Sequence, residues 1–93
     1  MIKSFAGRDT ERLFARERVR RYPSLVQRVM LRKLVIVDSA ESLDDLRTPP
    51  GNRLERLRGD RAGRHSIRVN DQWRICFRWS GGNAYDVELV DYH

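Results

Sequence analysis

The sequence predicts an α+β fold in which two N-terminal helices pack on one face of a small, mainly antiparallel β-sheet. Apolar residues recur at three- and four-residue steps between residues 25 and 37, and after residue 53 they alternate with polar residues. Helices followed by a run of strands are typical of α+β proteins. A chain of 93 residues can bury one hydrophobic core but not two, so we expect a single domain over residues 1–93.

The beginning of the chain predicts a short strand and a short helix. Residues 2–5 alternate apolar and polar side chains, which favours a strand. Asp9 can cap a helix over residues 10–16, because its carboxylate can accept hydrogen bonds from the first backbone N–H groups. Leu13 and Phe14 give that helix its inner face.

A longer helix is expected to start at Pro23, a residue that suits the first helical turn, and to end near Asp38. Its apolar stripe consists of Leu25, Val26, Val29, Met30, Leu34 and Val37. Residues 42–46 can form one more helical turn. Residues 48–52 predict a rigid loop, because two prolines and a glycine cannot continue a helix.

Four strands are expected after this loop, at residues 53–57, 65–69, 73–79 and 85–89. In the third strand one face carries Trp73, Ile75, Phe77 and Trp79, and the other carries Arg74, Cys76 and Arg78. In the fourth, Tyr85, Val87 and Leu89 alternate with Asp86 and Glu88. One face of an antiparallel sheet can be charged. We therefore expect the helices to cover the apolar face, and Arg68, Arg74 and Arg78 to form a cationic patch on the other.

The charge composition favours a nucleic-acid partner. The net charge is +6, the pI is about 10.4, and seventeen of the nineteen basic residues are arginines. Arginine can bind a phosphate through two hydrogen bonds and can stack on bases. A codon bias that fills the surface with solvated arginines would give the same count, so the positions of the arginines have to decide.

The sequence disfavours several other classes of protein. The chain has no secretory segment at its start, and its longest strongly apolar run, residues 34–37, is too short for a membrane span, so we expect a cytoplasmic protein. The single cysteine, Cys76, excludes an internal disulfide and is expected to be a buried thiol. His65 and His93 are far apart, and no phosphate-binding glycine loop is present, so we expect neither a metal nor a cofactor.

The remaining polar residues suit metal-free cleavage of RNA. RNA carries its own nucleophile, the 2′-OH, so an enzyme has to supply a base, an acid and a cation. Glu55 is a candidate base and His93 a candidate acid or base. Arg68 and Arg74 can hold the scissile phosphate, and Tyr92 can stack on a base or bind the phosphate.

Each of these assignments has a structural alternative. Glu55 can be a solvated residue or an ion-pair partner, and the arginines can be paired with Asp86 or Glu88 across the sheet. Tyr92 and His93 can form a frayed tail, although here they directly continue a strand. His65 is expected to be structural.

Four segments of the sequence resemble the HigB branch of the RelE toxin superfamily. They are residues 49–55 (PPGNRLE), 57–61 (LRGDR), 66–77 (SIRVNDQWRICF) and 90–93 (VDYH). Residues 2–5 and 10–14 are similar as well, so the resemblance covers almost the whole chain. It implies a RelE-like microbial RNase fold and ribosome-dependent cleavage of mRNA by 2′-OH attack, which yields a 2′,3′-cyclic phosphate and a 5′-OH. It also implies a helix-turn-helix antitoxin of the HigA type, whose complex with the toxin binds operator DNA mainly through the antitoxin.

The resemblance also implies roles for individual residues. Arg74 matches the arginine that clamps the phosphate, and Arg68 matches a second basic residue of the site. Further residues are expected to bind RNA: Arg53, Arg58, Arg61, Arg78 and Asp91. Some relatives carry a histidine at the position of Glu55 and others a glutamate that serves as base, so either Glu55 or His93 can take the proton. The alternatives to an enzyme are a non-catalytic module that binds RNA or the ribosome, and a pure interaction partner of the antitoxin.

Overall fold

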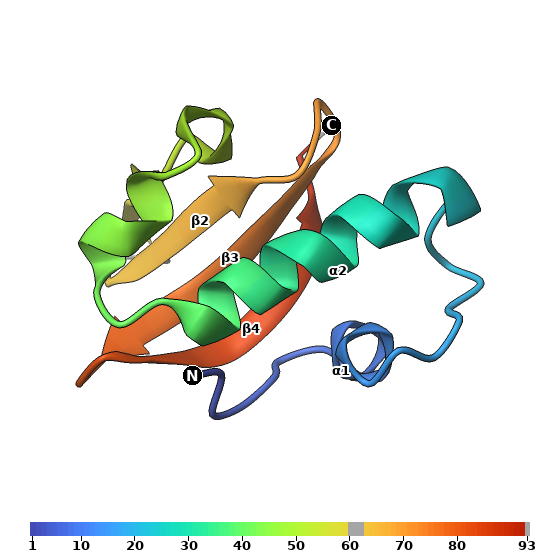
Figure 1. Ribbon diagram of the computed structural model, residues 1–93, viewed down its shortest axis with the longest axis horizontal. Helices are drawn as coiled ribbons and strands as arrows, with labels where there is room; N and C mark the ends of the chain where they lie inside the picture. The colour runs from blue at the N-terminus through green and yellow to red at the C-terminus, as the bar shows by residue number, and fades with distance from the viewer. Residues whose placement is uncertain (60–62, 93) are drawn as a thin grey trace.

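The computed structural model describes residues 1–59 and 63–92 and has the expected α+β architecture (Figure 1). Its helices are α1 (Arg8–Phe14) and α2 (Ser24–Ser39), followed by two short 3₁₀ helices, η1 (Leu43–Arg47) and η2 (Pro50–Asn52). Its strands are β1 (Glu55–Arg56), β2 (Arg64–Arg68), β3 (Trp73–Ser80) and β4 (Asn83–Asp91). They form one antiparallel sheet in the order β1-β2-β3-β4.

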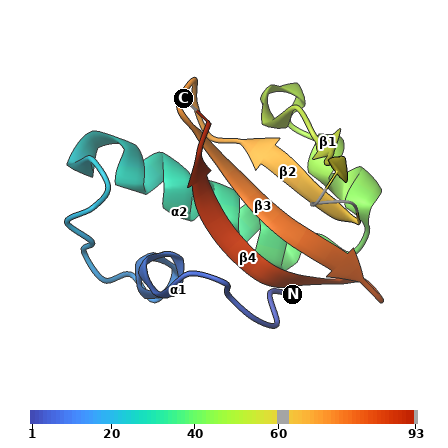
Figure 2. The same cartoon turned by 180° about the vertical axis from the view of Figure 1, so that it is seen from behind.

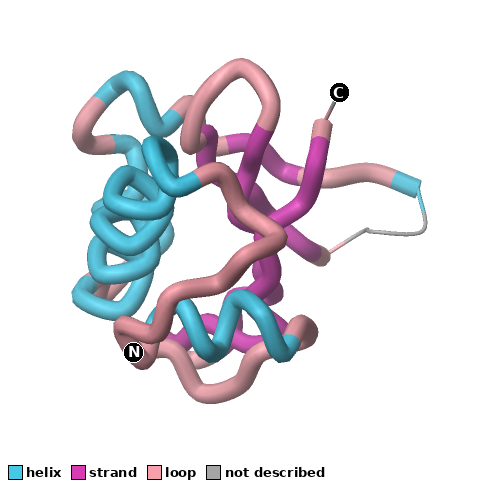
Figure 3. Tube along the Cα trace, turned by 90° about the vertical axis from the view of Figure 1, so that its right-hand side faces the viewer, coloured by secondary structure: helices cyan, strands magenta, loops and turns pink. Residues whose placement is uncertain are grey.

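The helices and the sheet form two layers with the core between them. Helix α2 lies across one face of the sheet, and the opposite face is left uncovered by helices (Figures 1 and 2). Figure 3 shows the two layers from the side. The fully buried side chains at the interface come from both layers and include Met30, Leu34, Val37, Ile67, Ile75 and Phe77. This confirms which face of β3 is apolar. None of the helices in these residues is long and apolar enough to span a membrane.

The N-terminal prediction needs two corrections. Helix α1 begins at Arg8, two residues before the predicted start, and extended Gly7 occupies the N-cap position. The predicted Asp9 cap is therefore wrong, because Asp9 lies inside the first turn, where its carboxylate is 3.8 Å from the Arg21 guanidinium. The segment 2–5 forms no strand; two isolated parallel bridges join it to β4.

Two predicted apolar positions are also wrong. Leu25 is 92% exposed, because it lies nine residues before Leu34, which is about half a turn away around a helix of 3.6 residues per turn. Tyr85 leaves the apolar face because β4 is irregular opposite residues 76–78, and Asp86 there has a φ of 54°. Such a bulge shifts the alternation by one residue. As a result, Tyr85 pairs with Arg78, whereas Val87 remains in the core.

The stability of the fold is expected to fall below neutral pH because of His65. This half-buried side chain stacks on Phe77 with a centroid distance of 6.3 Å, and burial lowers its pKa from the usual 6.5, with the Arg56 charge lowering it further. Below about pH 6.5 the unfolded chain therefore binds a proton that the folded chain does not, and the free energy of unfolding decreases until the folded-state pKa is passed.

Urea unfolding between about pH 7.5 and pH 5 checks this effect, with His65→Leu as the comparison. The variant has no imidazole to protonate, so its stability should decline less across this range than that of the wild type. Equal pH dependence of the two proteins would show that His65 titrates normally in the folded state.

Candidate active site

Arg74 on β3 is the centre of the uncovered sheet face. Its side chain is only 9% exposed, although it points away from the helices. Nε donates a hydrogen bond to Oγ of Ser66 (2.9 Å), and Nη2 donates to the carbonyl oxygens of Arg53 (2.7 Å) and Ser66 (3.3 Å). The remaining nitrogen, Nη1, lies 3.9 Å from Oε1 of Glu55. The guanidinium is thus fixed on two sides, and its third side faces a carboxylate.

The strand register brings Glu55, Ser66 and Arg68 to the same face as Arg74. Glu55 is paired with Ser66 across β1 and β2, and Arg68 is paired with Arg74 across β2 and β3. Residues directly opposite each other in an antiparallel pair project from the same side of the sheet. Arg68 forms an ion pair with Asp71, so the turn between β2 and β3 restrains it beside Arg74.

Tyr92 completes this group from the end of β4. Its ring centroid is 5.7 Å from Cζ of Arg74, and its side chain is accessible to solvent. The backbone N–H of Tyr92 donates to the carbonyl of Gln72 (2.6 Å), so the chain is anchored up to this residue rather than frayed. The expectation for His93 lies outside the described residues.

The structure does not extend the patch to Arg78. That side chain stacks on Tyr85 (4.6 Å from Cζ to the ring centroid) and lies 3.5 Å from the Asp86 carboxylate. Arg64 is 3.7 Å from both Asp86 and Glu88, so this end of the sheet holds an ion-pair cluster. Arg78 is four residues from Arg74, about 13 Å along an extended strand. The three arginines therefore share the predicted face, but only Arg68 and Arg74 are adjacent, and Arg78 belongs to the ion-pair cluster at the other end of the sheet.

Three of the other candidate RNA-binding residues, Arg53, Arg58 and Asp91, are exposed. Arg53 contributes its carbonyl to Arg74, while its side chain is exposed; Arg58 is exposed beyond β1. Asp91 is exposed at the end of β4, where Oδ2 accepts a hydrogen bond from the Gln72 amide (3.2 Å). Arg61 lies outside the described residues.

The sequence analysis missed two buried polar residues near the site, Ser66 and Lys33. Ser66 is fully buried. Because it precedes Arg68 by two residues on β2, the strand alternation could have placed it on the same face as the arginines. Lys33 is not among the residues of the predicted apolar stripe of α2, but it is buried. It follows Met30 by three residues and precedes Val37 by four, and this helical spacing could have revealed it.

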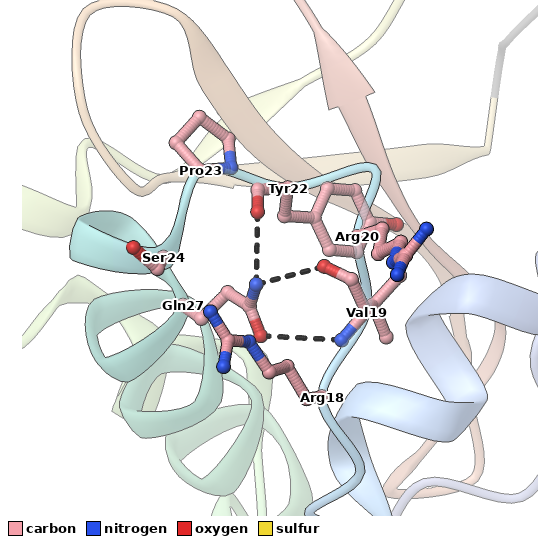
Figure 4. Close-up of a pocket in the computed structure, with 7 residues that line it drawn as sticks. All are labelled: Arg18, Val19, Arg20, Tyr22, Pro23, Ser24 and Gln27. Atoms are coloured by element: carbon pink, nitrogen blue, oxygen red, sulfur yellow. Dashed lines mark hydrogen bonds between the residues drawn. The ribbon is translucent and has the colours of Figure 1, made fainter.

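A surface cavity of about 570 Å³ lies away from this group, at the loop between α1 and α2 (Figure 4). Gln27 on α2 closes the loop from the inside, because Nε2 donates to the carbonyls of Val19 and Tyr22, both at 2.8 Å. Arg18 and Arg20 line the cavity and are exposed. The cavity is therefore lined by positively charged side chains. It contains none of the residues grouped around Arg74.

The group around Arg74 has the parts that phosphodiester cleavage requires. A fixed guanidinium can bind a phosphate, a neighbouring carboxylate can exchange a proton, and an exposed aromatic ring can stack on a base. Glu55 and Tyr92 are exposed, and the Arg74 side chain beside them is 9% exposed. In residues 1–59 and 63–92, no three His, Cys, Asp or Glu side chains are grouped so that they could hold a metal ion.

Comparison with known proteins identifies the family of the chain. Residues 3–93 match the family of HigB-like toxins, described as RelE-like toxins of the type II toxin–antitoxin system HigB. The chain is 47% identical over 73 residues to Toxin HigB-1 of Vibrio cholerae, which is 78% of this chain and 77% of that protein. It is 33% identical over 93 residues, the full length of both chains, to a Proteus vulgaris protein named Endoribonuclease HigB.

Proposed function

The chain belongs to the HigB-like family of RelE-like toxins of type II toxin–antitoxin systems, and from this premise we propose that it is an endoribonuclease that cuts mRNA on the ribosome. The observation that carries the proposal is the Arg74 guanidinium, which Ser66 and the Arg53 carbonyl hold in place and whose Nη1 lies 3.9 Å from Oε1 of Glu55. A preorganised cation of this kind stabilises charge that develops on a phosphate in the transition state.

The proposed reaction needs no metal, because the nucleophile comes from the RNA. The 2′-oxygen attacks the adjacent phosphorus while a base removes its proton, the bond from phosphorus to O5′ breaks, and an acid protonates O5′. The products are a 2′,3′-cyclic phosphate and a 5′-OH. Glu55 and His93 are the proton-handling pair, Arg74 and Arg68 bind the phosphate, and Tyr92 stacks on a neighbouring base.

The proposed partners are an antitoxin of the HigA type and the 70S ribosome with its mRNA. The family supplies the argument for an antitoxin, since type II toxins are paired with a protein inhibitor, and operator DNA would be bound mainly by the antitoxin in the complex. The argument for ribosomal RNA is electrostatic: four exposed arginines, Arg18, Arg20, Arg28 and Arg32, lie on and around α2. Arginines of this kind bind a phosphate backbone in a salt-dependent manner. Such a role places the protein in the cytoplasm.

Expression without an antitoxin tests the proposal. We expect growth arrest and mRNA ends inside codons, visible by primer extension, and cleavage of purified mRNA only when ribosomes are present. A single 2′-deoxynucleotide at the cut site should block cleavage on the ribosome, because the nucleophile is missing. Continued cutting of that substrate would refute the 2′-OH mechanism, and intact transcripts with ribosome binding would identify a non-catalytic module.

Substitution of the two proton-handling residues should separate their roles. We expect Glu55→Gln and His93→Gln each to lower kcat by about 10²–10⁴-fold, the usual contribution of a general acid or base. An RNA with sulfur in place of O5′ has a leaving group that needs no proton. The variant that lacks the acid should regain activity on this substrate, and the variant that lacks the base should not. If both variants keep wild-type kcat, neither residue transfers a proton.

A further inference from the structure

Lys33 on helix α2 is a buried cation that contacts the loop preceding β1. Lys33 is 7% exposed, and its ammonium donates a hydrogen bond to Oδ1 of Asn52, which is fully buried. A buried lysine is usually paired with a carboxylate, because an unpaired charge is costly in a low-dielectric environment. Within the described ranges no carboxylate forms an ion pair with Lys33. Its partner is a neutral amide, so the charge is retained at an energetic cost.

The surroundings of Lys33 add to that cost. Burial lowers the pKa of its ammonium group, and the guanidinium groups of Arg32 and Arg68 lower it further. A hydrophobic side chain of similar length would avoid both penalties. Buried polar groups of this kind are retained where they fix one arrangement of the chain, which is often the arrangement that a functional site requires.

The position of Asn52 explains which arrangement is fixed. Its amide nitrogen donates to the carbonyls of Leu46 (3.1 Å) and Thr48 (3.2 Å), so one side chain joins the end of η1, the following loop and α2. The next residue, Arg53, has a left-handed backbone with φ 44° and ψ 60°. A non-glycine residue adopts this conformation only when its surroundings impose it.

The left-handed turn at Arg53 has a direct effect on the active site. It directs the Arg53 carbonyl to Nη2 of Arg74 (2.7 Å), and two residues later the chain enters β1 with Glu55 beside Nη1. The continuous path is therefore from Lys33 to Asn52, from Asn52 to the Arg53 backbone, and from there to both charged groups of the site.

We propose that Lys33 and Asn52 are positioning residues for RNA cleavage, which hold the loop of residues 48–53 so that Arg53 orients Arg74 and Glu55 enters β1 beside it. The inference rests on the proposed function, because the reaction it affects is RNA cleavage. Lys33 is buried and does not touch the substrate. It acts through the loop, and a misplacement of about 1 Å in catalytic groups can cost about 10²-fold in rate.

Lys33→Met tests the proposal, because methionine keeps most of the side-chain length and removes the ammonium. We expect kcat for ribosome-bound mRNA to fall by about 10²-fold with little change in KM. Val37→Ala is the matched control: Val37 is buried on the same helix one turn later, and its truncation destabilises the protein without removing a polar contact of the loop. Its kcat, measured well below its Tm, should equal that of the wild type.

A double variant gives a second comparison. In Lys33→Met/Asn52→Leu the orphaned Oδ1 of Asn52 is removed, but the carbonyls of Leu46 and Thr48 lose their donor, so the free energy of unfolding should not recover relative to Lys33→Met alone. Its kcat should stay low, because nothing then links η1 and the loop to α2. Wild-type kcat in Lys33→Met, or recovery of kcat in the double variant, would reduce the pair to a structural role and overturn the proposal.

Nuclear magnetic resonance of the Arg74 side chain gives a readout that does not depend on cleavage. In the wild type the hydrogen bonds to Ser66 and Arg53 should slow rotation of the guanidinium and keep its Nη hydrogens distinct at low temperature. Lys33→Met should merge these resonances, while Val37→Ala should not. Unchanged Arg74 resonances in Lys33→Met would also overturn the proposal. Absence of cleavage by the wild type would refute the proposed function but leave this link measurable.

Discussion

Replacing Arg74 by lysine is expected to lower kcat for cleavage of ribosome-bound mRNA by about 10²–10³-fold, the usual cost of removing one preorganised donor to a transition-state charge. Lysine retains the positive charge, but a single ammonium group cannot replace the fork that binds Ser66 and Arg53 and presents Nη1 toward Glu55. The buried acceptors left without a donor should also cost about 1–3 kcal/mol of stability.

Arg47→Lys is the matched control for this experiment. Arg47 is an exposed arginine on η1 whose guanidinium pairs with Asp44, three residues earlier in the chain. It should keep wild-type kcat, since an exposed pair contributes little and touches none of the catalytic groups. Comparable kcat values for Arg74→Lys and the wild type would show that only the charge at Arg74 matters, and the positioning argument for Arg53 and Lys33 would then fail with it.

The parts of the fold that follow from side-chain periodicity could be predicted from the sequence. The change from a helical step to a two-residue step located α2 and the strands β2 to β4, and the same alternation placed Ile75 and Phe77 inward and Arg74 outward. The same alternation predicted that Arg68 shares the face of Arg74, and the structure adds that the two residues are directly paired.

The features that escaped prediction depend on backbone conformations with no local sequence signal. Arg53 and Asp86 have positive φ values although neither is a glycine, and tertiary contacts impose them. The left-handed backbone at Arg53 shortens β1 and directs the Arg53 carbonyl to Arg74. The positive φ at Asp86 introduces the bulge that turns Tyr85 toward Arg78 and away from Val87. A one-residue shift in a strand reverses which face a side chain occupies, so one unrecognised bulge altered the expected patch.

The candidate site divides in the same way. Its charged groups, Glu55 and Arg74, were recognisable because their residue types suit RNA cleavage and their positions lie on the charged face. The residues that hold these groups in place, Ser66 and Asn52, were not recognisable. They are common polar residues, and their role follows only from contacts with residues distant in the sequence. Burial and hydrogen bonding, which the sequence does not display, distinguish them from loop residues.

Phe77→Ala is expected to destabilise the protein by about 3–5 kcal/mol, the usual range for truncating a buried phenylalanine. Phe77 is fully buried, stacks on His65 and contacts the edge of Trp79 with a centroid distance of 6.2 Å. Domains of this size are usually stable by only about 5–15 kcal/mol, so the loss is a large share of the total. Urea unfolding followed by circular dichroism and tryptophan fluorescence should show a lower midpoint with an unchanged slope.

Activity measurements on this variant distinguish the core from the site. Phe77 and Arg74 share β3 but project from opposite faces, and the bonds from Arg74 to Ser66 and Arg53 involve no atom of the Phe77 side chain. At a temperature where Phe77→Ala is folded, its kcat should therefore equal that of the wild type, in contrast to Arg74→Lys. Phe77→Leu, which leaves a smaller void, should lose less stability than Phe77→Ala. A loss below about 1 kcal/mol in Phe77→Ala would contradict the packing of α2 on the apolar face of β3.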